Sequence, residues 1–388
     1  CAAVVREAMG QPPDSQIPEY ERAIRGDSLL DRAYQRLGQR YLAIGDSLNA
    51  LGAFRAQMYL TPDDRTRWYG VINQYIVIGE YSEAESIVNE WLEREPNDLE
   101  FLTLKTLACF RGKLWGCAVA SLEKQYELND EFREDAQFYK DIMAAAMAAD
   151  LPDAVMRWSG VAVENLPDDL DLWAARATTL NDAGMMDEAV VAYERILALD
   201  PESAASAMFL AQHILEGVSI DTLVPLDTAA LGLAREYLDM AGYIGQDRAD
   251  TGVMMNLAVS YLQVGSDLVQ TQLDIELGME WLERALENDV MRRLTDRANF
   301  FIGLGMVYTI FDFDPQINAY VERFADLTPA DKRAVCLLVA QEAAMVGRGK
   351  QAMIAGAAVH QPTADQMLVQ YSNFETRIPQ LQEAFECN

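Results

Sequence analysis

Residues 170–203 read LDLWAARATTLNDAGMMDEAVVAYERILALDPES, and this stretch decides the fold. Its large apolar residues recur at the three- and four-residue spacing that gives a helix one buried face. Gly184 stands where a first helix would end, because glycine adopts the left-handed conformation that closes many helices. Pro201 follows a second helix that it cannot extend. The stretch therefore predicts two antiparallel helices joined by a tight turn.

The same pattern recurs along most of the chain. Pro62 and Pro96 close two units and are 34 residues apart, as are Gly45 and Gly79, which end first helices. One helical hairpin cannot bury its own apolar stripe, so neighbouring units must stack. Nine units are predicted, near residues 31–64, 65–97, 98–131, 135–168, 170–203, 204–243, 251–289, 298–331 and 333–363.

This pattern resembles the tetratricopeptide repeat (TPR), in which W-x2-L-G-x2-Y lies in the first helix, A-x3-F-x2-A in the second, and proline at the close. Trp173, Leu180, Tyr193 and Pro201 carry the resemblance in the unit quoted above. It covers roughly residues 28–363, strongly in three units and weakly in six. The resemblance implies an all-α fold, a right-handed superhelical solenoid of about nine helical hairpins.

Two flanking segments complete the predicted organisation. Residues 1–27 contain a proline-rich stretch at 11–18 and are expected to form an extended tether. Residues 364–388 are expected to form a capping helix, interrupted by Pro379, which shields the last apolar face from water.

The first helices of a TPR solenoid line its concave side, and the resemblance places a mostly uncharged set of residues there. Several are methionines, whose flexible side chains fit varied partner shapes, so we expect a groove that binds a partner helix or an extended apolar segment. The alternative is that these side chains pack against neighbouring repeats or beneath the N-terminal arm. The set consists of Tyr69, Asn73, Ile76, Leu102, Thr106, Tyr139, Met143, Met208, Gln212, Met255, Val259, Ile302, Met306 and Leu337.

The composition excludes several other functions. Acidic residues number 61 against 31 basic ones, and the resulting charge of −30 would repel nucleic acid. The apolar runs are far shorter than the roughly 20 residues of a membrane-spanning helix. His213 and His360 have no second ligand at metal-binding spacing, and no nucleophile, zinc or phosphate-loop motif is complete. We therefore expect no enzyme activity, no metal and no cofactor.

The chain begins with Cys1, which resembles the acylated first residue of a mature bacterial lipoprotein. The resemblance implies a lipid at Cys1 as the sole membrane contact, each buried CH₂ contributing about 0.8 kcal/mol. It also implies a location in the bacterial cell envelope, anchored to the outer membrane and facing the periplasm or the exterior. An arbitrary chain start is the alternative interpretation.

The other four cysteines are Cys109, Cys117, Cys336 and Cys387. In an envelope protein they allow two disulfides. Cys109 and Cys117 would flank a tight turn between antiparallel helices, within bridging distance, which leaves Cys336 and Cys387 for each other. Four buried thiols in packing positions are the alternative.

Together these features favour a non-catalytic scaffold of the cell envelope that binds other proteins. In outline the chain is similar to TPR lipoproteins that assist outer-membrane assembly, pilus assembly or peptidoglycan remodelling, and that machinery would supply its partners. The alternative is a structural subunit that stacks end to end with copies of itself into an extracellular filament, because an uncapped repeat face offers a non-closing interface.

Overall fold

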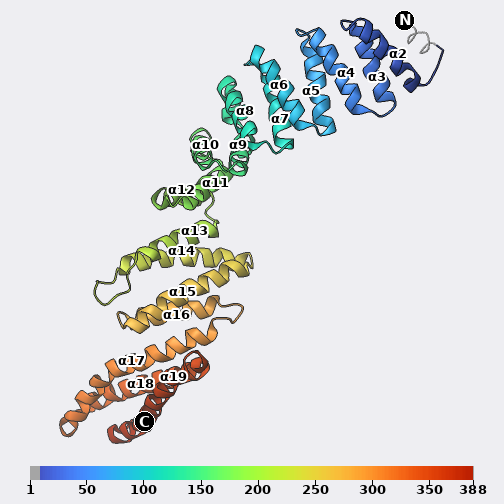
Figure 1. Ribbon diagram of the computed structural model, residues 1–388. Coiled ribbons are helices and arrows are strands. Elements are labelled where there is room, and N and C mark those ends of the chain that lie inside the picture. The colour runs from blue at the N-terminus through green and yellow to red at the C-terminus, as the bar shows by residue number, and fades with distance from the viewer. Residues whose placement is uncertain (1–8, 388) are drawn as a thin grey trace. The chain divides into compact units, whose positions relative to one another are not determined.

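The structure is a computed structural model that describes residues 9–387, and it consists of helices joined by turns (Figure 1). This part of the chain contains no strand, and the predicted all-α fold is confirmed. None of its helices has the length and hydropathy needed to cross a membrane. Two compact units divide the chain, the first ending at Met185 and the second beginning at Met186. Cys1, the predicted lipid attachment site, lies outside the described residues.

The first unit is built from helix pairs that fall within the predicted units from 31–64 to 135–168. Gly45 and Gly79 adopt positive φ angles of 82° and 89° where first helices end, a conformation that a residue with a Cβ atom disfavours. The helices are α2 (Pro13–Gly26), α3 (Asp31–Ala43), α4 (Ser47–Leu60), α5 (Arg65–Ile78), α6 (Tyr81–Arg94), α7 (Leu99–Arg111), α8 (Trp115–Leu128), α9 (Ala136–Ala148), α10 (Pro152–Asn165) and α11 (Leu170–Asp182), with the short 3-10 helix η1 (Asp130–Glu134) before α9.

Aspartate side chains begin the first helices of successive pairs. Asp64, Asp98, Asp135 and Asp169 each accept a hydrogen bond from a backbone N–H in the first turn of α5, α7, α9 and α11. A carboxylate there satisfies N–H groups that have no partner within the helix, and it lies at the positive end of the helix dipole. Part of the chain's excess of acidic residues therefore stabilises helix starts.

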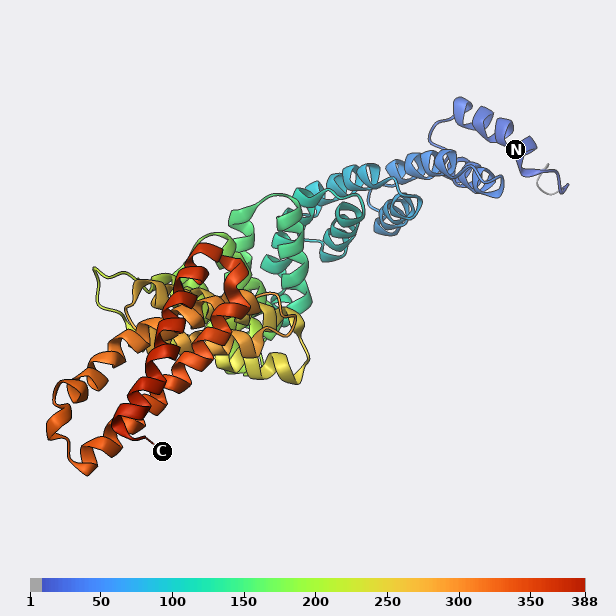
Figure 2. The ribbon, with the colours of Figure 1, turned by 90° about the horizontal axis from the view of Figure 1, so that it is seen from below.

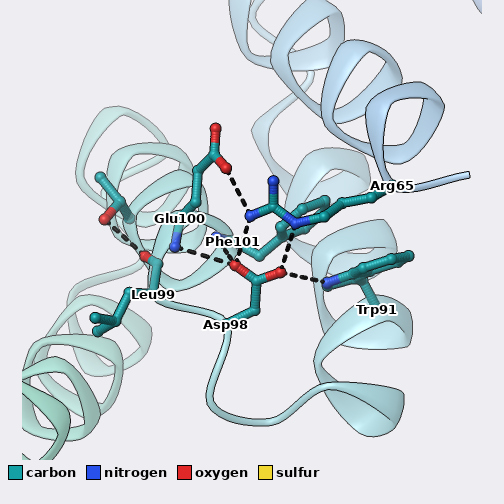
Figure 3. Close-up of polar contacts among 7 residues, drawn as sticks. Arg65, Trp91, Asp98, Leu99, Glu100 and Phe101 are labelled. Atoms are coloured by element: carbon teal, nitrogen blue, oxygen red, sulfur yellow. Dashed lines mark hydrogen bonds and ion pairs between the residues drawn. The ribbon is translucent and has the colours of Figure 1, made fainter.

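Asp98 also joins three helices of the first unit (Figure 3). Its carboxylate accepts two hydrogen bonds of 2.9 Å from Arg65 of α5 and one of 3.1 Å from Trp91 Nε1 of α6. Arg65 also forms a 2.6 Å ion pair with Glu100 and lies over the Phe101 ring. That ring stacks on Trp91 with the two centroids 4.7 Å apart. One aspartate thus caps α7 and holds it against the preceding helix pair.

The second unit contains longer helices than the first. Helices α14 and α15 have 20 and 21 residues, and the last three have 28, 28 and 25. Residues 218–227 form the loop between α13 and α14. The helices are α12 (Met186–Leu199), α13 (Ala204–Gly217), α14 (Thr228–Asp247), α15 (Thr251–Thr271), α16 (Ile275–Asn288), α17 (Thr295–Glu322), α18 (Pro329–Gly356) and α19 (Gln361–Phe385), with 3-10 helices η2 (Phe324–Asp326) and η3 (Ala357–Val359).

The prediction of a helical hairpin in each of 298–331 and 333–363 is wrong. Single helices of 28 residues, α17 and α18, occupy most of these segments and pack against each other and against α19, as the orange and red ribbons of Figure 2 show. Gly349 lies inside α18, where Met306 and the Tyr371 hydroxyl occupy the space that the Cβ atom of any other residue would need. Glycine here lets helices approach closely and does not end one.

The predicted extended tether at 1–27 is also wrong where the structure describes it, because Pro13–Gly26 forms helix α2. Pro13 is the first residue of that helix, a position where no backbone donor is needed. Ile17 and Tyr20 belong to a hydrophobic cluster with Leu37 of α3 and Ala53 of α4. At the other end, α19 occupies the segment predicted as the terminal helix and continues through Pro379.

A buried carboxylate lies among α17, α18 and α19. Glu342 of α18 is 0% exposed, and neither of its side-chain oxygens has a hydrogen-bond partner among the described residues. Arg377 of α19 forms an ion pair with Asp314 of α17 and is thereby neutralised. Burial raises the pKa of Glu342, with Arg377 opposing the change and Asp314 adding to it. The Glu342 carboxyl group therefore keeps its proton to a higher pH in the folded chain than in the unfolded one.

Replacing Asp98 with alanine is expected to lower the free energy of unfolding by about 2–4 kcal/mol, since α7 loses its cap and the buried Trp91 N–H loses its acceptor. Burial would raise the pKa of Asp98, but hydrogen bonds from Arg65, Trp91 and the Phe101 backbone outweigh it and lower that pKa. The stabilisation is therefore present above about pH 4 and lost as the pH falls toward the lowered pKa.

Urea unfolding of the Asp98→Ala protein at pH 7 measures this loss. Glu100→Ala is the matched control, because it removes an exposed ion pair to the same arginine and is expected to cost less than about 1 kcal/mol. Equal losses in the two variants would show that Asp98 does not join the helices.

Replacing Glu342 with glutamine is expected to raise the melting temperature at neutral pH. A carboxyl group with a raised folded-state pKa stabilises the protein below its unfolded pKa, near 4.5, and that contribution is lost as the pH rises through the folded pKa. The advantage of Glu342→Gln is therefore expected to be largest at pH 8 and to shrink toward pH 4. Melting curves at both pH values measure it, with Glu383→Gln on the exposed surface of α19 as the control. A pH-independent difference would contradict the burial argument.

Candidate protein-binding groove

The residues predicted to line a concave groove divide into a buried and an accessible set. Neighbouring helices cover the buried set; Tyr139, for example, lies against the rings of Tyr126 and Trp158. The buried residues are Ile76, Leu102, Tyr139, Met143, Met208, Ile302 and Met306. The accessible or half-buried residues are Tyr69, Asn73, Thr106, Gln212, Met255, Val259 and Leu337. In both units, buried residues of the predicted groove set therefore lie between accessible ones along the sequence.

An open groove of about 820 Å³ lies between α9, α10 and α11 of the first unit. Four methionines line it, and we call it the methionine groove. Met147 is 67% exposed and Met185 37%, whereas Met143, which alone of the four was predicted from the sequence, is 5% exposed. The lining residues are Met143, Met147, Asp150, Leu151, Pro152, Asp153, Val155, Met156, Ala174, Ala175, Thr178, Thr179, Asp182, Ala183 and Met185.

The local sequence explains why space remains between these helices. Met143 and Met147 are four residues apart on α9 and therefore share one face of that helix. A tight turn follows, in which Asp150 has a positive φ of 57°, and Pro152 begins α10. From α11 come the alanines and threonines of 174–179, whose small side chains leave the gap unfilled.

Acidic side chains border the methionine groove. Asp150 lies in the turn after α9, Asp153 in the first turn of α10, and Asp182 at the end of α11. None of the three forms an ion pair with another described residue, and the lining contains no lysine, arginine or histidine. The groove therefore combines an apolar floor with carboxylates whose charge the described part of the chain leaves unneutralised.

Each of the two histidines interacts with a residue three or four positions away in the sequence. His360 Nδ1 accepts a hydrogen bond of 3.3 Å from the Thr363 N–H and so caps α19. The His213 ring lies parallel to that of Phe209, with the centroids 6.5 Å apart. Within residues 9–387, no group of three or more His, Cys, Asp or Glu residues is placed to hold a metal ion.

Two disulfides join the cysteines that follow Cys1 in the sequence. Cys109 near the end of α7 is joined to Cys117 in the first turn of α8, so this bond closes one helix pair. Cys336 of α18 is joined to Cys387, which follows α19. These are the two pairs predicted from the sequence, for which four buried thiols were the alternative.

Repeated helix pairs and an open apolar groove define an all-α helical repeat protein. Residues 170–213, which include α11 and α12, match the tetratricopeptide repeat family model. The chain is therefore a helical repeat protein that contains a tetratricopeptide repeat at residues 170–213. Proteins of this kind typically act as protein-binding scaffolds without catalytic activity.

Several solved structures are similar to this chain. The crystal structure of MamA is 18% identical with a TM-score of 0.33, over 46% of this chain and 96% of MamA. YrrB, described as a TPR protein with an unusual peptide-binding site, is 17% identical with a TM-score of 0.25, over 59% of this chain and 93% of YrrB. The TPR domain of P58(IPK) is 13% identical with a TM-score of 0.28, over 97% of each chain. No curated protein matches the chain.

Glutamate substitutions are expected to separate the accessible methionines from those in the core. Met147→Glu should change the free energy of unfolding by less than about 0.5 kcal/mol, because the side chain already lies in water. Met306→Glu should cost several kcal/mol, on the order of 3 or more, because a charge in the packed core loses its hydration without gaining a partner. Thermal melts followed by circular dichroism measure both, and a large loss in Met147→Glu would show that the methionine groove is closed in solution.

Proposed function

We propose that this chain is a non-catalytic scaffold that binds a segment of another protein in the methionine groove. The observation that carries the proposal is the accessible apolar lining, to which Met147, Leu151 and Met185 contribute exposed surface. Pockets for small ligands are concave, mostly apolar and about 300–1,000 Å³ in volume, so a cavity of this size holds a few apolar side chains of a partner segment. The methionine groove, at about 820 Å³, lies within that range.

The chemistry of the lining favours a flexible fit to a helix or an extended segment. Thioether side chains are unbranched and polarizable, so they repack around apolar groups of different shapes. An amphipathic helix presents such groups at three- and four-residue spacing, and an extended segment presents every second one. The groove accommodates the side chains of one face of such a segment, while the rest of the partner stays outside.

We also propose that the scaffold acts outside the reducing cytosol, in a cell envelope. The two disulfides support this location, because structural disulfides persist mainly in oxidising compartments. Free thiols at Cys109, Cys117, Cys336 and Cys387, trapped by alkylation at the moment of cell lysis, would contradict it.

Selection of peptides from a random 16-residue library against the full chain tests the binding proposal. Selected peptides are expected to compete with one another for one site. The double substitution Met147→Gln and Leu151→Gln should weaken them at least about tenfold, since two apolar contacts in the groove are lost. Fluorescence anisotropy with labelled peptides measures the affinities.

Leu48→Gln is the matched control for this experiment, because Leu48 of α4 is 61% exposed, similar to Met147, but lies outside the groove. It should leave the affinities unchanged. Peptides that bind equally well to the groove variant, or a library that yields no binders, would overturn the proposal.

A further inference from the structure

The methionine groove carries a charge pattern that narrows the class of partner. Asp150, Asp153 and Asp182 border it, each without an ion pair among the described residues, and no cationic side chain lines it. The last turns of α9 and α11 also end beside it, and the carbonyl end of a helix carries about half a negative charge. The start of α10 brings an opposite partial charge, and the Arg176 guanidinium lies 3.0 Å from the Met156 sulfur atom. Three carboxylates against this one guanidinium leave the surroundings of the groove negative.

We infer that the partner segment is cationic and amphipathic: it places apolar side chains on the methionines and lysine or arginine side chains beside the three aspartates. This inference rests on the proposed function. An acidic segment would bring like charges beside Asp150, Asp153 and Asp182, and a partner that repels its site binds poorly even where its apolar face fits. The net charge of −30 adds long-range attraction for a cationic partner and repulsion for an acidic one.

The methionines and the aspartates contribute differently to binding in this arrangement. The apolar contacts hold the segment, because they are removed from water on binding. The carboxylates stay partly hydrated, so they select the partner's charge and make binding sensitive to salt. Both features are therefore needed, and a segment with only one of them is expected to bind weakly.

Four synthetic peptides of 18 residues test this inference with the full chain. The first has a leucine face and a lysine face, the second replaces each lysine with glutamate, the third replaces each leucine with serine, and the fourth replaces each lysine with glutamine. Anisotropy titrations are expected to show the leucine–lysine peptide binding at least about tenfold more tightly than each of the others. Raising the salt concentration from 50 to about 300 mM should reduce that preference.

Substitutions locate the source of the preference. The triple variant Asp150→Asn, Asp153→Asn and Asp182→Asn should reduce the preference for lysine over glutamate to about threefold or less. The control variant Glu93→Gln, Glu95→Gln and Glu134→Gln removes three exposed charges that do not line the groove and should leave the preference unchanged.

Each outcome is decisive. Equal binding of the leucine–lysine, leucine–glutamate and leucine–glutamine peptides, lost in Met147→Gln, would overturn the charge inference and leave the groove function standing. A lysine preference that the triple asparagine variant retains would also overturn it, because the charge would then come from elsewhere on the surface. Binding of the serine–lysine peptide as tightly as the leucine–lysine one, or binding insensitive to Met147→Gln, would overturn the groove function itself.

Discussion

Each helix pair in this chain leaves an apolar stripe that only a neighbouring pair can cover, and the rest of the structure depends on that packing. The junction at Asp98 shows how polar groups are fitted to it. Trp91 and Phe101 bury apolar area where two pairs meet, and the aspartate satisfies both the Trp91 N–H and the first turn of α7. Stacking supplies the stabilisation, and carboxylates at helix starts remove the cost of leaving backbone donors without partners.

The sequence predicted the fold where its signals have one structural meaning. A glycine at a helix end and a proline after the next helix mark a hairpin, as at Gly79 and Pro96, and the structure follows them. It failed where the same residue types have a second use. No hairpin turn forms within 333–363, where Gly349 lies inside α18 and contacts Met306 of α17. Pro13 begins a helix in the segment that was predicted to be an extended tether. Tertiary packing decides such cases, and it involves residues far apart in the chain.

The methionine groove was only partly predictable for the same reason. Met143 was found because it has the right position within a repeat, yet position alone does not tell whether a neighbouring helix covers a side chain. The space arises from a mismatch between the long side chains of α9 and α10 and the small ones of 174–179. That alanine- and threonine-rich run, next to a methionine-rich segment, was the available signal. Pairing the two requires knowing that α11 packs on α9 and α10.

The Cys336–Cys387 disulfide gives the second unit a mechanical asymmetry. In a linear array each repeat touches only its neighbours, so loss of structure starts most easily at a terminal element. The bond closes a 51-residue segment and, by its effect on chain entropy, opposes unfolding there by about 4 kcal/mol. Because the bond ties the end of α19 to α18, α19 cannot separate from α18 at that end alone, and a pulling force applied at Cys387 passes through the disulfide to Cys336 of α18.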